Sequence, residues 1–118
     1  MQGKRLDRVN QLIKEEVSML LQRELKDPRL GFVTVTEVET AKDLRQAKIY
    51  VSVLGGEQQW AASLAALESA RGFIRNWLRS HLDLRVTPVL TFHADRSMEH
   101  AAHIQTLLKR LGGERESS

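Results

Sequence analysis

Hydrophobic residues recur at three- and four-residue steps through the first part of the chain. The residues with this spacing are Leu6, Val9, Ile13, Val17 and Leu20. They share one face of an amphipathic helix, which we predict from residue 5 to about residue 25. Asp27-Pro28 ends this helix, because proline disfavours the helical conformation in the residue before it.

Two β-strands are predicted next. Residues 32–39 are rich in β-branched side chains, but the valines change face between Val35 and Val38, so we expect a β-bulge between them. Residues 47–53 alternate between apolar and polar side chains without a break, which is typical of a strand with one buried face. The polar connection over residues 40–46 should let the two strands pair antiparallel.

A longer helical pattern covers residues 60–82. Its apolar residues in one arc are Trp60, Leu64, Leu67, Ile74, Leu78 and Leu82. Arg71 falls in the same arc, and burial of an unpaired guanidinium is costly. Gly72 follows directly, and glycine permits a helix to break. We therefore predict two helices that meet in a kink at Ala70-Arg71-Gly72, with Arg71 turned outward, and we expect leucine at Gly72 to disturb the kink.

A third strand and a last helix complete the pattern. The strand is predicted over residues 89–94, and the helix runs from Ser97, a plausible N-cap, to about Leu111. The helix residues expected to be buried are Ala101, Ile104, Leu107, Leu108 and Leu111. Residues 112–118 should form a short flexible tail.

The order α-β-β-α-(kink)-α-β-α predicts an α+β domain with helices packed on a three-stranded mixed sheet. The helical stretch between the second and third strands is long enough for a right-handed crossover to a parallel neighbour. At 118 residues the chain is expected to form a single domain over residues 1–111, followed by the tail.

The charge distribution points to a polyanionic partner. The formal net charge is +3 and the pI is about 9.6. Basic residues outnumber acidic ones in residues 1–30 and 71–96, whereas residues 31–70 are net negative. Clusters of Lys and Arg attract phosphates, so nucleic acid is a natural partner.

The chain shows no pattern for export or for crossing a membrane. No apolar run approaches the roughly 20 residues that span a bilayer, and the first residues lack the pattern of a signal peptide. The absence of cysteine excludes disulfides and thiolate chemistry. We therefore expect a cytoplasmic protein with no membrane partner.

Candidate catalytic groups do not converge in the sequence. His100 and His103 could join a metal site, but zinc needs three or four protein ligands, and a structural role for His100 on the apolar arc is the commoner case. Asp27 and Asp95 are loop carboxylates, which more often cap helices or form turns than act as an acid–base pair. No nucleotide-binding or hydrolase motif is present. We expect no enzymatic activity, cofactor, metal or small-molecule substrate, and a hydrolase or nuclease is the least favoured alternative.

Arginines are the strongest candidate binding groups. Arg71, Arg75 and Arg79 follow at four-residue steps, and no acidic residue occurs in residues 71–82. The planar guanidinium matches the geometry of phosphate, although a charged helix face is often only solvated. Tyr50 is a candidate for stacking on a base. The predicted RNA-binding residues are Lys4, Arg5, Arg8, Arg29, Lys48, Arg71, Arg75, Arg79 and Arg85.

Several of these landmarks also occur together, in this order, in a known family. The segments concerned are Lys26-Asp27-Pro28-Arg29-Leu30-Gly31, Val33-Thr34-Val35-Thr36, Asp43-Leu44, Ala47-Lys48-Ile49-Tyr50-Val51-Ser52-Val53, Ala70-Arg71-Gly72-Phe73-Ile74-Arg75, Leu84-Arg85, Thr87-Pro88, Leu90-Thr91-Phe92, Asp95 and Ser97. Over about residues 4–111 the chain resembles the ribosome-binding factor A family. Each segment is a weak signal alone, but the ordered set is specific.

The resemblance implies a type II KH-like fold in which the usual GxxG loop is replaced by a helix–kink–helix with an Ala-x-Gly sequence, here Ala70-Arg71-Gly72. It also implies a monomeric, non-enzymatic assembly factor that binds the free small (30S) ribosomal subunit and its 16S rRNA. Such a factor supports late maturation and 5′-end processing of the rRNA and is linked to cold adaptation. Without the GxxG pair, the usual KH grip on a single strand is not implied.

Two other binding functions remain open at this point. The chain could be a protein-interaction module, whose outward helix faces bind a partner protein, or another KH-like RNA-binding protein. RNA binding that weakens steeply with added salt would favour the RNA-binding readings, and salt-insensitive binding to a protein would favour the interaction module.

Overall fold

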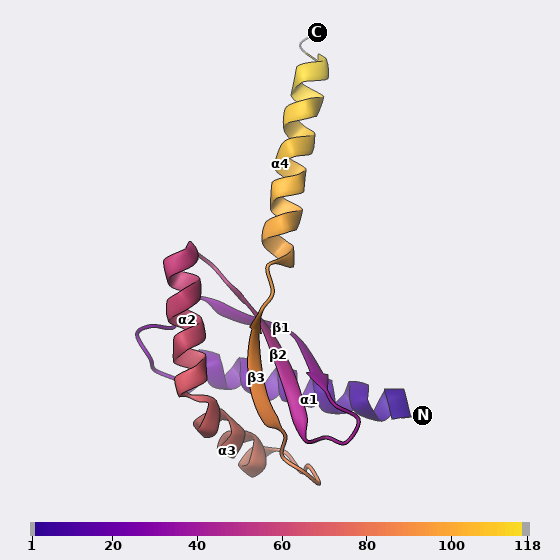
Figure 1. Cartoon of the computed structure of the whole chain (residues 1–118), viewed down its shortest axis with the longest axis vertical. Coiled ribbons are helices and arrows are strands. Elements are labelled where there is room, and N and C mark those ends of the chain that lie inside the picture. The colour runs from indigo at the N-terminus through magenta and orange to yellow at the C-terminus, as the bar shows by residue number, and fades with distance from the viewer. Residues whose placement is uncertain (1, 117–118) are drawn as a thin grey trace.

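A computed structural model describes residues 2–116, with side chains for residues 3–112. The chain forms four helices and three strands, as predicted (Figure 1). In chain order they are α1 (Gln2–Arg23), β1 (Val33–Thr40), β2 (Gln46–Val53), α2 (Glu57–Ser69), α3 (Arg71–His81), β3 (Val89–Ala94) and α4 (Ser97–Glu116). No helix within residues 2–116 combines the length and the hydrophobicity needed to cross a membrane.

The strands form one mixed sheet in the order β1-β2-β3. β1 pairs antiparallel with β2, and β2 pairs parallel with β3, which confirms the predicted hairpin and crossover. The register of β1 against β2 shifts between Val35 and Glu37, so the expected bulge is present. It allows both Val35 and Val38 to be buried.

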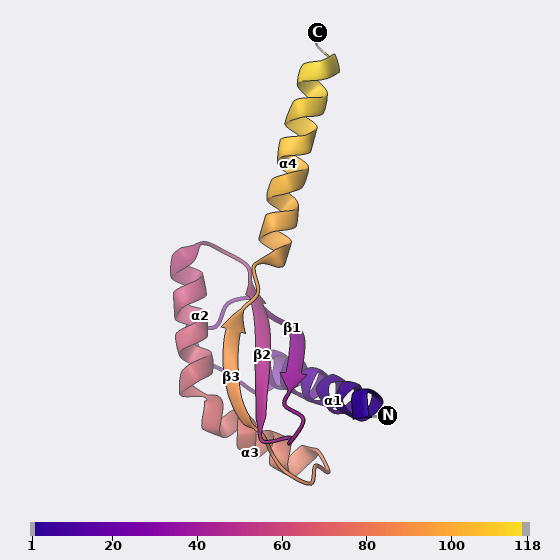
Figure 2. The ribbon, with the colours of Figure 1, turned by 45° about the vertical axis from the view of Figure 1, so that its right-hand side comes forward.

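One face of the sheet is covered by α1, α2 and α3, and the other is open (Figure 2). The buried side chains of β2 alternate with exposed or half-buried ones from Lys48 to Ser52. A single hydrophobic cluster joins the sheet to the three helices. Its members are Ile13, Val17, Leu20, Val35, Val38, Ala47, Ile49, Val51, Leu67, Ile74, Leu78 and Leu90.

The kink lies at Ala70, between α2 and α3. Ala70 has φ −89° and ψ 1°, a conformation that residues other than glycine adopt. Arg71 points outward, with 46% of its side chain exposed, and its Nη1 lies 2.9 Å from Glu68 Oε1, as predicted. Gly72 lies inside α3, directly after the break, and a Cβ built there meets no atom within 4 Å, so the space around it does not require glycine.

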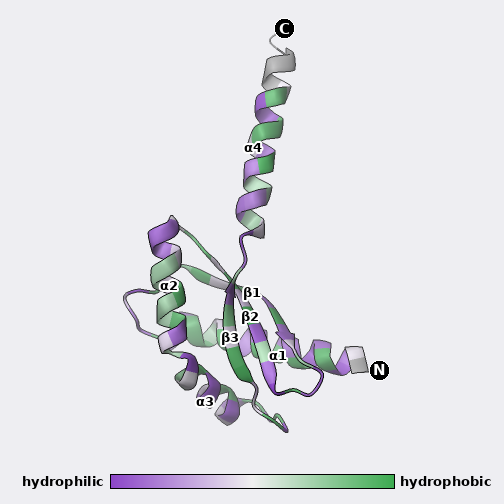
Figure 3. Cartoon of the chain, in the orientation of Figure 1, coloured by the Kyte–Doolittle hydropathy of each residue, from purple (hydrophilic) through white to green (hydrophobic). Residues whose placement is uncertain are grey.

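The last helix does not contribute to the core as expected. α4 projects from the body of the domain (Figures 1 and 3), and its apolar residues are exposed: Ile104 55%, Leu107 42%, Leu108 61% and Leu111 57%. It also ends at Glu116 rather than near Leu111, within the expected tail, of which residues 117–118 lie outside the described part. An amphipathic pattern predicts a buried face, but it does not specify what covers that face.

Contacts at the base of α4 fix the direction of the helix. Trp60, in the core as predicted, donates its indole N–H to Glu99 Oε1 at 2.9 Å. The Arg96 guanidinium lies 4.3 Å from the centroid of the Trp60 ring and binds both carboxylate oxygens of Glu57. The backbone N–H of Ser97 donates to Asp95 Oδ1 at 3.0 Å, so Asp95 supplies the capping oxygen that we expected from Ser97.

Candidate nucleic-acid interface

A basic groove lies where the start of α1, the β1–β2 loop and the α3–β3 loop meet. It has a volume of about 440 Å³ and is lined by Arg5, Leu6, Lys42, Asp43, Leu44, Arg45, Arg85 and Val86. Four of these side chains are cationic and one is acidic. Among the side chains described for residues 3–112, the ion pairs involve none of the four cations. Their charge therefore remains free to attract an anion.

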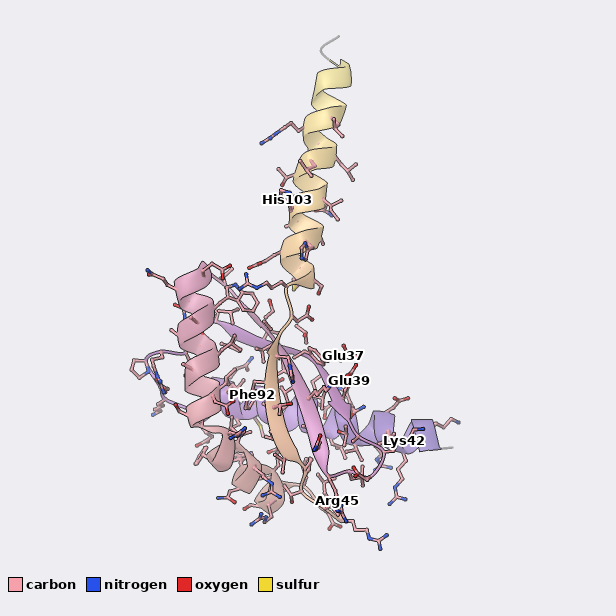
Figure 4. All side chains as sticks on the ribbon, in the orientation of Figure 1. Glu37, Glu39, Lys42, Arg45, Phe92 and His103 are labelled. Carbon is pink, nitrogen blue, oxygen red and sulfur yellow. The ribbon has the colours of Figure 1, made fainter. Side chains whose placement is uncertain are left out.

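The β1–β2 loop forms one wall of the groove through a tight turn. Leu44 has φ 63°, in the left-handed region that side chains other than Gly, Asn and Asp seldom occupy. Its N–H donates to Ala41 O at 2.9 Å, and Asp43 Oδ1 accepts the backbone N–H of Arg45 at 3.0 Å. The one carboxylate of the groove is thus engaged by the loop. Figure 4 shows Lys42 beside α1 and Arg45 at the end of the sheet.

Arg75 holds the opposite wall in place. Its Nε donates to Pro88 O at 3.2 Å and its Nη2 to Thr87 O at 3.0 Å. These bonds tie α3 to the segment that follows Arg85 and Val86. Arg75 was predicted to bind phosphate, and two of its donors are bound to backbone carbonyls. The structure therefore gives Arg75 a positioning role.

The third wall is the N-terminal turn of α1. Arg5 and Leu6 line the groove, and the first turn of the helix contains no acidic residue. Lys4 and Arg8 are exposed beside Arg5, and a three-residue step places Arg8 on the same side of the helix. Arg79 is exposed in the last turn of α3. Lys4 and Arg8 therefore add positive charge at the start of α1, whereas Arg79 lies outside the groove lining.

Three other predicted binding residues lie apart from the groove lining. Arg29 pairs with Asp27 at 2.8 Å, a bond that lowers the pKa of the Asp27 carboxyl. Arg71 pairs with Glu68, and Lys48 is exposed on the open sheet face, where its register partner is Glu39. Exposed ion pairs contribute roughly 0–1 kcal/mol, so they do not lock Arg29 or Arg71, but the acidic partner offsets the positive charge.

Lys42 and Arg45 were missed in the sequence analysis. They lie in residues 31–70, whose net negative charge drew attention away from them. Of the acidic residues in that stretch, only Asp43 lines the groove. Glu37 and Glu39 lie on β1 (Figure 4), and Glu57 and Glu68 lie on α2. Two cations within a short predicted hairpin loop were the signal that could have identified them.

The open face of the sheet does not offer a free stacking platform. Tyr50 is half-buried, its ring lies 5.4 Å from that of His93, and its hydroxyl donates to Glu39 Oε2 at 3.3 Å. Partial burial and the nearby Glu39 raise the pKa of Tyr50. With Glu37 close by, this face repels phosphate more than it attracts it.

The other candidate sites contain fewer groups that could bind a charged ligand. A second hollow, of about 360 Å³, is lined by Leu21, Gln22, Leu30, Gly31, Phe32, Val33 and Thr34 and contains no charged side chain. His100 and His103 are exposed on α4, and the part of the chain described by the structure contains no group of three His, Asp or Glu residues suited to a metal ion.

Comparison with known proteins gives a consistent family assignment. The family model "Ribosome-binding factor A" matches residues 5–108. Ribosome-binding factor A of Desulfitobacterium hafniense is 50% identical over 112 residues, which cover 95% of this chain and 90% of that protein.

Solved structures show the same fold. The crystal structure of ribosome-binding factor A from Thermus thermophilus matches with a TM-score of 0.68 at 27% identity, over 75% of this chain and 94% of that chain. A homology model of the Thermus thermophilus factor, fitted into a cryo-EM map of its complex with the 30S subunit, matches with a TM-score of 0.63 at 29% identity, over 74% and 91% of the two chains.

Proposed function

Because the chain belongs to the ribosome-binding factor A family, we propose that it binds the free 30S subunit through 16S rRNA in the cytoplasm. There it acts as a monomeric, non-enzymatic assembly factor that assists late maturation and 5′-end processing of the rRNA, including during growth in the cold. The Thermus thermophilus relative fitted into a map of a 30S complex supports the small subunit as the partner.

The basic groove is the observation that carries this proposal. It brings Arg5, Lys42, Arg45 and Arg85 together from three separate segments, and none of these cations takes part in the ion pairs among the described side chains. Phosphate neutralisation by such cations supplies much of the affinity of a nucleic-acid complex. Lys4, Arg8 and Arg79 would contact phosphates farther along the same strand.

A protein-interaction role is the second candidate. The exposed apolar residues of α4, among them Ile104 and Leu108, favour it, since contiguous apolar surface often marks a protein contact. Association through this face would be insensitive to salt, whereas association through the basic groove would weaken steeply as salt rises.

Sedimentation of a cell lysate on a sucrose gradient tests the proposed function. We expect the protein to migrate with free 30S subunits and to be depleted from polysomes. An Arg45→Gln/Arg85→Gln double variant should shift toward the top of the gradient, and the Lys109→Gln/Arg110→Gln control on α4 should not. Equal abundance of the unchanged protein on polysomes and free 30S subunits would contradict the proposal.

A further inference from the structure

The lining of the basic groove includes three apolar residues, which we call its floor: Leu6, Leu44 and Val86. Leu6 and Leu44 are partly buried, and Val86 is 38% exposed. They come from the same three segments that supply the cations. A phosphate group resting on this floor would lose water without gaining a hydrogen bond there, which is unfavourable. Charge alone therefore does not account for the composition of the groove.

We propose that the basic groove takes an unpaired nucleotide, with the base against Leu6, Leu44 and Val86 and the flanking phosphates on the surrounding cations. This inference rests on the proposed function and specifies its substrate class as single-stranded or bulged RNA. In an A-form duplex the bases are stacked and paired, so a duplex could offer its phosphates to the groove but not a free base face.

The size and the side chains of the groove suit one nucleotide. Its volume of about 440 Å³ lies within the roughly 300–1,000 Å³ of small-ligand sites. Arg5, Arg45 and Arg85 carry planar guanidinium groups, which stack on unpaired bases as well as pairing with phosphate. The groove can therefore hold a base and its two neighbouring phosphates with different parts of the same side chains.

The groove is also held in shape before any ligand arrives. Leu44 is fixed by the turn from Ala41 to Asp43, and the N–H of Val89 donates to Arg45 O at 2.9 Å. On the opposite wall, Arg75 ties down Thr87 and Pro88. A preformed site avoids part of the entropic cost of ordering loops on binding.

The test compares three RNA probes at one salt concentration. They are an oligouridylate of about eight nucleotides, a strand of equal length in which the bases are removed, and a hairpin duplex with the same number of phosphates. Because an unpaired base can bury an apolar face against these residues and stack on the guanidinium groups, we expect the oligouridylate to bind about ten times more tightly than either of the other two probes.

Variants in the floor connect this preference to the groove. Val86→Ser should lower affinity for the oligouridylate about threefold, since it removes part of the apolar contact, with little effect on the abasic strand. Leu6→Ser, on α1, should act in the same way. Leu54→Ser is the matched control, because Leu54 is 74% exposed and follows β2 outside the groove lining.

The outcomes separate this inference from the proposed function. Equal affinity for the oligouridylate, the abasic strand and the duplex would overturn the inference even if the protein sediments with 30S subunits. A preference for the oligouridylate that Val86→Ser and Leu6→Ser leave unchanged would also overturn it, because the base would then be bound elsewhere. Failure to sediment with 30S subunits would instead contradict the proposed function.

Discussion

Replacement of Arg75 by glutamine should destabilise the domain and should not act by removing a phosphate ligand. Arg75 is half-buried and donates two hydrogen bonds, to Thr87 O and Pro88 O. A hydrogen bond to a charged group contributes roughly 1.5–3 kcal/mol, and a buried acceptor left unpaired adds a cost. Arg75 is partly exposed, and the glutamine amide can restore one of the two bonds. We therefore expect the free energy of unfolding to fall by about 2 kcal/mol.

Thermal unfolding followed by circular dichroism measures this effect. For a domain of this size, a loss of about 2 kcal/mol lowers Tm by roughly 8 °C. Arg79→Gln is the control, since Arg79 is exposed on the same helix and such changes usually stay within about 0.5 kcal/mol. Arg75→Lys should also be destabilising, because lysine keeps the charge but lacks the fork that reaches two carbonyls.

The role of Arg75 would be refuted by two results taken together. If Arg75→Gln and Arg79→Gln unfold at the same temperature, the carbonyl contacts contribute little to stability. If Arg75→Lys also binds RNA normally while Arg75→Gln does not, the charge of Arg75 acts directly on phosphate.

Three further substitutions test the fold in other places. Gly72→Ala should stabilise the domain by about 0.5–1 kcal/mol in urea unfolding, since Gly72 is helical with room for a Cβ; a loss of stability would mean that the kink needs glycine. Gly55→Ala should destabilise it in the same assay, because Gly55 has φ +135° and a Cβ would lie 2.9 Å from Gln59; an unchanged midpoint would contradict this. Hydrogen bonds from Ser97 and from the Thr36 side chain lower the pKa of Asp95 from 3.8 to about 2. Its ionised form therefore stabilises the fold above about pH 4, and that contribution is lost as the pH falls toward 2. Asp95→Asn should flatten the decline in stability over this interval, and an unchanged acid profile would rule out the contribution of Asp95.

The predictions that held came from positions where the spacing of residues conflicts with a regular helix or strand. The change of face between Val35 and Val38 identified the bulge, and Arg71 within an apolar arc identified the kink. Each of these positions would have placed a side chain on the wrong surface in a regular element. Such a conflict can be recognised from spacing alone.

The predictions that failed depended on contacts between distant segments. The apolar stripe of α4 predicted burial, but the body of the domain covers only the base of that helix, through Trp60 and Glu99. The binding role of Arg75 stays a prediction, and regular spacing gave no sign that Thr87 and Pro88 engage this side chain. Periodicity describes which side chains share a face, but it does not identify the atoms that the face meets.

The residues of the basic groove were also predicted only in part. Arg5 and Arg85 were expected to bind RNA, and the structure brings them to one groove. Lys42 and Arg45 were overlooked because the net charge was counted along residues 31–70, whereas a ligand meets the charges that lie together on one surface. A turn with Leu44 in the left-handed region directs the loop toward α1, and no short-range pattern in the sequence specified that approach.

The dependence of 30S binding on salt tests the central claim most directly. Affinity of purified 30S subunits for the unchanged protein, for Arg45→Gln/Arg85→Gln and for Lys109→Gln/Arg110→Gln would be measured across a series of salt concentrations. If the basic groove holds rRNA, the groove variant should lose affinity, and its slope of log affinity against log salt should flatten by about 1.4–1.8, corresponding to two phosphate contacts. The α4 variant should keep the slope of the unchanged protein. Equal slopes for all three proteins, or a flatter slope for the α4 variant alone, would contradict the assignment of the basic groove as the rRNA-binding surface.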